Sequence, residues 1–251
     1  MLVGLKLKDN MQHASVGKLF KEQVQRYSHK DQYKNSSLKP LIFEWLKGKK
    51  TNKKLEICEF GGGAGQLLGE LKKVYPHCKY SNVEIINDYK KFLVSKEINF
   101  IVGSVLNSQF PDNSFDVIIM RDVLHHLVGS SYQETLNNQN RALMELKRLL
   151  RPQGAVFIEE LTNESLVAGR TIYYLANLIS RLNINISLLG VSSKAVVFFL
   201  QSSNLRALCY KIFGRENIAE IQIIPQQANW QTKLAHLGGG IRKAFIVIEK
   251  K

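Results

Sequence analysis

One stretch, LEICEFGGGAGQLLGEL at residues 55–71, constrains the fold of this chain more than any other. Its apolar start, up to Phe60, suits a buried parallel strand. Four glycines within five residues follow, and leucines then recur at helical spacing. The stretch therefore predicts a strand, a glycine turn and a helix. Such a turn brings bare backbone and a helix N-terminus up to a ligand, because glycine has no Cβ.

The spacing of the glycines bears on which ligand the turn binds. A dinucleotide loop of the G-x-G-x-x-G kind would need a third glycine at position 66, which is Gln66. The turn instead follows the pattern E-x-G-x-G-x-G, with Glu59 just before it. A carboxylate there would repel a pyrophosphate and would suit a ligand with a positive amino group and no phosphate. S-adenosylmethionine (SAM) is such a ligand, although a structural turn explains a glycine loop alone equally well.

The next predicted strand, residues 80–84, ends in a second acid. Glu84 lies nineteen residues beyond Gly65, close to the offset at which nucleotide-binding α/β units place a carboxylate on ribose hydroxyls. One helix and one returning strand bring the end of the second strand beside the loop. Glu84 is therefore predicted to accept hydrogen bonds from a ribose.

Two further blocks follow in order. FPDNSFDVIIMRDVLHHL, residues 110–127, gives a turn, a strand over residues 115–120 and a V-L-H-H segment, and a long amphipathic helix then leads through RPQG into the strand AVFIEE. Over residues 54–161 these motifs resemble class I SAM-dependent methyltransferases, in particular the type 11 group. The resemblance implies a Rossmann-like α/β fold, with a seven-stranded, mostly parallel sheet, helices on both faces and an antiparallel last strand. It also implies a helical lid inserted after the fifth strand.

The resemblance assigns roles to individual residues. Glu59 would bind the amino group of SAM, and the backbone around Arg121 would line the adenosine. The third predicted strand, residues 99–105, ends in Gly103 and Ser104 where the family often has Gly-Asp, so a hydroxyl replaces the carboxylate that accepts from the adenine amino group. The implied cofactor-binding residues are Glu59, Gly61, Gly63, Gly65, Glu84, Ile85, Ser104, Val105 and Arg121, with no metal ligand.

Methyl transfer from a sulfonium mainly needs the acceptor, methyl and sulfur to be aligned. A base is needed only if the acceptor must lose a proton. By family position His125 and His126 lie near the transferred methyl, and histidine exchanges a proton near neutral pH. Asp122 is a weaker candidate. Packing, or lining the cofactor pocket, is an equally strong interpretation of either histidine, and neighbours about 100° apart on a helix should not face one pocket.

The chain is predicted to form a single domain with elaborations on the cofactor core. In the N-terminal cap, apolar residues from Val16 to Tyr27 and the segment PLIFEWLKG favour two helices, and Tyr27 or Tyr33 would border the methionine end of SAM or simply pack. The predicted segments are an N-terminal helical cap, residues 1–54, the SAM-binding core, 55–161, the helical lid, 162–213, and the closing strands, 214–251.

Charge and composition bear on partners. The formal net charge is +14, and residues 1–54 hold thirteen Lys or Arg against four acids. Such a segment suits nucleic acid or an anionic membrane, but a solvated lysine-rich surface is the favoured interpretation. The lid is unusually apolar, yet its uncharged runs are shorter than the roughly 20 residues of a membrane span. It suggests an apolar or aromatic acceptor, a homodimer face, peripheral contact with a bilayer, or simple packing on the domain.

Three cysteines, without metal spacing, argue against a disulfide scaffold, and Cys58 is predicted to be a core residue. The N-terminus has no long apolar region, so a cytoplasmic location is expected. The leading hypothesis is a SAM-dependent methyltransferase, with S-adenosylhomocysteine as product, acting on a small, apolar or aromatic molecule.

Three alternatives remain. An RNA- or tRNA-directed methyltransferase would use the basic segment, but MRDV after the fourth strand lacks the Asn/Asp-Pro-Pro-aromatic motif that clasps a flipped base. A non-catalytic binding module would keep the fold without turnover. An NAD-dependent enzyme is least favoured, because Glu59 and Gln66 stand against it.

Overall fold

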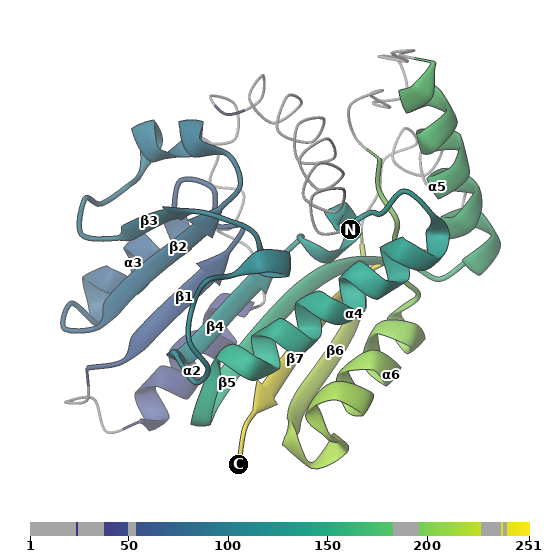
Figure 1. Cartoon of the computed structure of the whole chain (residues 1–251). Coiled ribbons are helices and arrows are strands. Elements are labelled where there is room, and N and C mark those ends of the chain that lie inside the picture. Colours follow the sequence, from purple (N-terminus) through teal and green to yellow (C-terminus); the bar gives the residue numbers. More distant parts are fainter. Residues whose placement is uncertain (1–23, 25–37, 50–53, 183–195, 227–236, 238–239) are drawn as a thin grey trace.

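The computed structural model describes residues 24, 38–49, 54–182, 196–226, 237 and 240–251. Within them, a seven-stranded sheet has the order β3-β2-β1-β4-β5-β7-β6 (Figure 1). Five strands are parallel, and β7 runs antiparallel to both β5 and β6. The strands are β1 (Glu56–Phe60), β2 (Lys79–Glu84), β3 (Asn99–Val102), β4 (Phe115–Arg121), β5 (Leu150–Asn163), β6 (Ile218–Pro225) and β7 (Ile241–Glu249). This is the predicted Rossmann-like arrangement, and its strand order reverses between β1 and β4. Ligands of open α/β sheets bind at such a point, beyond the carboxyl ends of the strands.

Helices cover both faces of the sheet (Figure 1). One face packs against α2 (Leu38–Gly48) and α3 (Gln66–Val74), whose leucines form a core with alternate residues of the central strands. The other face packs against α4 (Tyr132–Leu149) and α6 (Ser202–Phe213). The central strand β4 is buried along its whole length, as expected for a parallel strand covered on both faces. The helix α5 (Leu166–Arg181) follows β5 and lies beyond the carboxyl ends of the strands.

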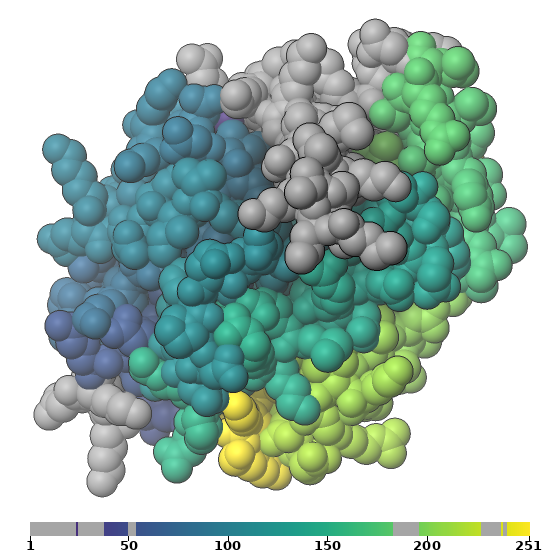
Figure 2. Space-filling view, in the orientation of Figure 1, coloured from purple at the N-terminus to yellow at the C-terminus, as the bar shows by residue number. Residues whose placement is uncertain are grey.

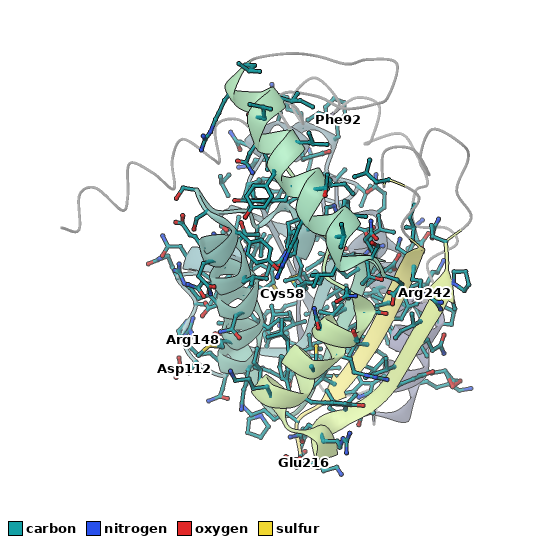
Figure 3. The ribbon with its side chains drawn as sticks, turned by 90° about the vertical axis from the view of Figure 1, so that its right-hand side faces the viewer. Cys58, Phe92, Asp112, Arg148, Glu216 and Arg242 are labelled. Carbon is teal, nitrogen blue, oxygen red and sulfur yellow. The ribbon has the colours of Figure 1, made fainter. Side chains whose placement is uncertain are left out.

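A buried cysteine and an ion pair show how the core and its edge are held. Cys58 is fully buried inside the sheet layer (Figure 3), and burial raises the pKa of its thiol well above the usual range. It is therefore a core residue, as predicted. At the edge, Arg148 from α4 contacts Asp112 at 2.5 Å and donates to the carbonyl of Phe110 at 2.9 Å (Figure 3). Arg148 thus fixes the turn that leads into β4.

Three predicted boundaries differ from the structure. The third strand ends at Val102 rather than Val105, because the Gly103 amide donates to the Glu84 carbonyl and Ser104 caps a short 3₁₀ turn, η2 (Val105–Asn107). The fifth strand is longer than AVFIEE, since β5 already starts at Leu150 and includes RPQG, with a register shift against β4. The V-L-H-H segment forms another 3₁₀ turn, η3 (Leu124–His126), rather than the start of an α-helix. Two more 3₁₀ turns, η1 (Asn87–Phe92) and η5 (Arg215–Asn217), lie in connections.

The predicted helical insertion, residues 162–213, contains α5 and α6, and these helices differ in how they pack on the sheet. In α6, Leu205 and Cys209 are fully buried in the core shared with α4 and the sheet. This helix therefore belongs to the layered fold. In the predicted N-terminal cap, α2 is present and Val24 is buried, whereas Tyr27, Tyr33 and the rest of the predicted first helix lie outside the described residues.

Candidate cofactor and acceptor site

The glycine loop adopts a backbone that side chains would obstruct. Gly61, Gly63 and Gly65 have φ of +74°, +54° and +73°, in the left-handed region that favours glycine. Gly62 is required for a different reason, since a Cβ there would lie 2.5 Å from Asn82 Oδ1 and 2.8 Å from a Glu59 carboxylate oxygen. The loop thus lies directly on the tips of β1 and β2, where the Gly61 amide donates to the Val83 carbonyl at 2.8 Å, and it leads into α3.

Glu84 joins the tip of β2 to this loop. Its two carboxylate oxygens accept from the amides of Gly63 and Ile86, each at 3.1 Å, while Asn82 Nδ2 donates to the Gly63 carbonyl at 2.8 Å. Glu84 is buried, and burial raises the pKa of its carboxyl group against the lowering effect of the amide donors. The structure therefore brings together the loop and the acid that the sequence offset had paired. Which group of a ligand Glu84 binds stays a prediction.

The residues predicted around the adenine lie at the same edge. Ile85, directly after Glu84, keeps 36% of its surface exposed. The Gly103 amide donates to the Glu84 carbonyl at 3.1 Å, so the end of β3 lies beside β2. The Ser104 hydroxyl accepts from the Leu106 amide at 3.2 Å and Val105 is buried. Ser104 thus already serves as the cap of η2.

Glu59 lies in a buried ion pair that the sequence did not reveal. Arg121 Nε donates to Glu59 Oε1 at 3.0 Å, and Nη2 of the same guanidinium contacts that oxygen. The two side chains are only 1% and 2% exposed. Arg121 was assigned to the site through its backbone, yet its side chain balances the charge of Glu59. The other oxygen, Oε2, has no hydrogen-bond partner among the described residues and lies under Gly62, so it is the oxygen left to accept from a ligand.

This pair begins a row of alternating charges across the sheet. Four neighbouring strands, β1, β4, β5 and β7, carry Glu59, Arg121, Glu159 and Lys243 at the same edge. Lys243 Nζ lies 2.5 Å from Glu159 and 3.3 Å from Asp122. Burial raises the pKa of Asp122, opposed by Lys243, and its φ of +52° is a strained value for a non-glycine residue. Asp122 thus has a defined partner in Lys243.

The candidate bases differ sharply from each other. His125 Nδ1 lies 2.5 Å from Glu160 Oε1, and the ring stacks on Phe199 with centroids 4.9 Å apart. Burial lowers the pKa of His125, but the carboxylates of Glu160 and Asp122 outweigh that effect, so the pKa is raised. Burial and the neighbouring His125 hold the pKa of His126 well below its usual range. The rings lie against each other, with centroids 4.0 Å apart, instead of diverging as expected for an α-helix.

Glu160 is the functional candidate that the sequence reasoning missed. Its carboxylate also accepts from the amides of Leu124, at 2.7 Å, and Leu161, at 3.0 Å. These contacts fix it against η3, so it holds the His125 ring in one orientation. The only sequence signal was the pair of acids that ends AVFIEE, at the carboxyl end of a strand where a buried parallel strand should be apolar.

Within the described ranges, no cluster of three or more His, Cys, Asp or Glu side chains is arranged to hold a metal ion. Among the same residues, no helix has both the length and the apolar character needed to cross a membrane. All three cysteines are free thiols.

A family model and several solved structures match this chain. The family model described as "Methyltransferase domain" matches residues 58–158. No curated protein matches the chain. The protein YcgJ from Bacillus subtilis has a similar structure, with 16% identity, a TM-score of 0.55 and coverage of 85% of this chain and 97% of that one. A SAM-dependent methyltransferase from Methanosarcina mazei has 16% identity and a TM-score of 0.57, over 84% of this chain and 97% of that one.

A third similar structure is geranyl diphosphate C-methyltransferase from Streptomyces coelicolor A3(2), in complex with Mg²⁺, geranyl diphosphate and S-adenosyl-L-homocysteine. It has 8% identity and a TM-score of 0.56, over 85% of this chain and 78% of that one. At these identities the likenesses to solved structures show the fold.

Proposed function

We propose that the protein is a class I methyltransferase that transfers the methyl group of SAM to a small, apolar or aromatic molecule, and the match of residues 58–158 to a methyltransferase domain supports the proposal. The observation that carries the proposal is Glu84, a buried carboxylate joined by hydrogen bonds to both the glycine loop and the start of the next turn. A carboxylate has about four acceptor sites, more than the backbone amides of Gly63, Ile85 and Ile86 use, so Glu84 can accept further hydrogen bonds. Two vicinal ribose hydroxyls match the two oxygens of this carboxylate.

The surrounding residues fit the rest of SAM. The exposed apolar surface of Ile85 suits one face of an adenine ring. The unpartnered oxygen of Glu59 suits a donor such as the methionine amino group. A pyrophosphate does not fit this set, because the acceptors beside the loop offer it no hydrogen and Glu84 would repel it. The residues at the loop therefore fit SAM better than a dinucleotide.

Once bound, SAM supplies a methyl group already activated on a sulfonium. The protein then has to align the acceptor and, where needed, take a proton from it. We assign the second task to His125. Glu160 accepts from Nδ1 of the ring, which fixes the proton on Nδ1 and leaves Nε2 with a lone pair that accepts the acceptor's proton. Phe199, stacked on the ring, keeps the imidazole in that orientation.

His126 suits another role. Its depressed pKa keeps the ring neutral near pH 7, so His126 is a weak base and does not readily accept a proton during turnover. We assign it to lining the pocket beside His125, and the difference in pKa separates the two residues experimentally. Exchange of either for alanine should therefore have unequal effects on turnover, the larger loss falling on His125→Ala.

Isothermal titration calorimetry of the purified full chain tests the cofactor. We expect saturable binding of SAM and of S-adenosylhomocysteine, with NAD⁺ and ATP giving no heat at the same concentrations. A screen of small apolar and aromatic acceptors with methyl-labelled SAM then tests turnover. Binding of NAD⁺ in place of SAM would overturn the proposal, and tight SAM binding without transfer to any acceptor class would favour a non-catalytic module.

An RNA acceptor is the second candidate, favoured by the net charge of +14. Its test is the salt dependence of binding to unmodified tRNA. Contacts to several phosphates give a steep fall in log affinity with log salt concentration. A shallow slope together with transfer to a small molecule would leave the leading proposal in place.

A further inference from the structure

The helix α5 presents an apolar surface to the outside of the molecule. In Figure 2 this helix, in green, forms the upper right edge of the molecular surface. At about 100° per residue, its large outward apolar residues fall within an arc of about 100°, so they form one stripe along the helix. The large apolar members of this α5 stripe and their exposed fractions are Val167 76%, Tyr174 59%, Leu175 45% and Leu178 52%, together with Leu182 58% at the C-cap, directly after the helix.

The charges on α5 all have one sign. The exposed Arg170 and Arg181 lie toward its two ends, and the helix contains no Asp or Glu. Arg170 packs over the ring of Tyr132, 5.0 Å from its centroid. The whole chain carries a net charge of +14. A surface with large apolar side chains, flanking arginines and no acid complements a layer that is apolar inside and anionic outside.

The inner side of α5 is fixed to the fold. The hydroxyl of Tyr173 donates to the Gly129 carbonyl at 3.2 Å, and Ser165 caps the helix through the Ala168 amide at 3.1 Å. Gly169 packs so closely that an added Cβ would lie 3.2 Å from the Phe199 carbonyl oxygen. The helix cannot turn its apolar stripe inward without breaking these contacts. The stripe is therefore an outer surface of the folded domain.

We propose that α5 docks this protein on the surface of an anionic lipid bilayer, with the α5 stripe inserted among the acyl chains and headgroups. Arginine suits this position, because its guanidinium pairs with phosphate while its stem lies along apolar surface. In a dimer formed through the same stripe, these like charges would be desolvated without an acid on α5 to balance them. The bilayer therefore fits the stripe better than a second copy does.

Docking would also orient the candidate site. The N-cap of α5, Ser165, follows the carboxyl end of β5 (Figure 1). The parallel strands β1 and β2 have their carboxyl ends at the same edge, where the glycine loop follows β1 and Glu84 ends β2. A bilayer under α5 would face that edge. This inference does not depend on the proposed reaction, since a non-catalytic protein with the same helix would dock equally.

Sedimentation with vesicles tests the proposal on the full chain. Vesicles of phosphatidylcholine with 30–40% phosphatidylglycerol, roughly the anionic content that gives a strongly negative surface, should bind the protein, and pure phosphatidylcholine vesicles should bind it at least tenfold more weakly. Leu178→Glu should reduce binding to the anionic vesicles at least tenfold, because it places a charge where a leucine would be buried. Arg170→Gln with Arg181→Gln should reduce it about 25-fold, roughly fivefold for each charge removed.

The matched control is Val74→Glu, because Val74 is 55% exposed on α3 and Leu178 is 52% exposed on α5. This variant should bind vesicles like the unaltered protein. Circular dichroism and SAM calorimetry should show that every variant remains folded. Absence of binding to anionic vesicles, or equal losses for Leu178→Glu and Val74→Glu, would overturn the proposal. A dimer in light scattering that Leu178→Glu dissociates would assign the stripe to a second copy instead.

Discussion

Replacing Glu84 by glutamine removes a charge from the proposed ribose site with almost no change of shape. In the free protein the carboxylate accepts two amides, and in the complex it would also accept two ribose hydroxyls. Hydrogen bonds to a charged group contribute about 1.5–3 kcal/mol each. Glu84→Gln keeps one acceptor oxygen and turns the other into a donor, so we expect a loss of about 3 kcal/mol in SAM binding. That loss corresponds to about 100-fold in affinity.

The pH dependence of binding gives a second, independent result. Burial raises the pKa of Glu84, and only the ionised form accepts from both ribose hydroxyls. A proton therefore competes with SAM, and affinity should be constant well above the pKa and fall by about tenfold per pH unit below it. Because the pKa is raised, the fall should begin at a higher pH than for an ordinary glutamate. Glu84→Gln should show no such fall over the same range.

Calorimetry of SAM binding across this pH range measures both results. Glu97→Gln is the control, because Glu97 has a 72% exposed side chain and forms only a surface ion pair with Lys72; its affinity and pH profile should match those of the unaltered protein. Thermal unfolding identifies any variant that has lost its fold. The reasoning is refuted if Glu84→Gln is folded and binds SAM as tightly as the unaltered protein.

Three further variants test other parts of the site. Gly62→Ala should weaken SAM binding and lower the free energy of unfolding by about 1–3 kcal/mol, measured by urea denaturation, because its Cβ would overlap two buried side chains. Arg121→Met should lower that free energy by about 3–5 kcal/mol by leaving Glu59 buried and unpaired, and adding Glu59→Gln should recover part of the loss; no recovery would contradict the pairing. Glu160→Gln should lower the pKa of His125 in an NMR titration, because burial is then opposed by Asp122 without the larger contribution of Glu160; an unchanged pKa would refute the assignment.

The parts of the fold that local chemistry fixes could be predicted from the sequence. The strand, glycine turn and helix at residues 55–71 follow from residue type alone, and the place of Glu84 follows from one helix and one returning strand. The extent of β5 could not be predicted, because RPQG resembles a turn. These residues fall in the register shift between Leu150, which pairs with Phe115, and Ala155, which pairs with Val117. The sequence also did not predict that α6 packs in the core, because its apolar residues have the spacing of any amphipathic helix.

The side-chain pairs of the site depend on information that a single sequence does not contain. Glu59 and Arg121 are 62 residues apart in the chain. They meet because β1 pairs with β4 in the register that sets Glu59 beside Ile119, which places Arg121 on the same face. His125 and Glu160, 35 residues apart, likewise meet only once β4 and β5 are neighbours. Strand order and register therefore decide these contacts, and motifs show only that the residues lie near the carboxyl ends of strands.

The row of charges across the sheet changes which residue selects the cofactor. Glu59 was expected to give the loop its preference for a cation, but Arg121 balances it, and Lys243 lies close to Glu159. The row as a whole is therefore close to neutral. Glu84 has only amide donors as partners, so it supplies the uncompensated negative charge at the loop. On the proposed function, rejection of phosphate-bearing cofactors thus depends on Glu84, and Glu84→Gln should relax that rejection as well as weaken SAM binding.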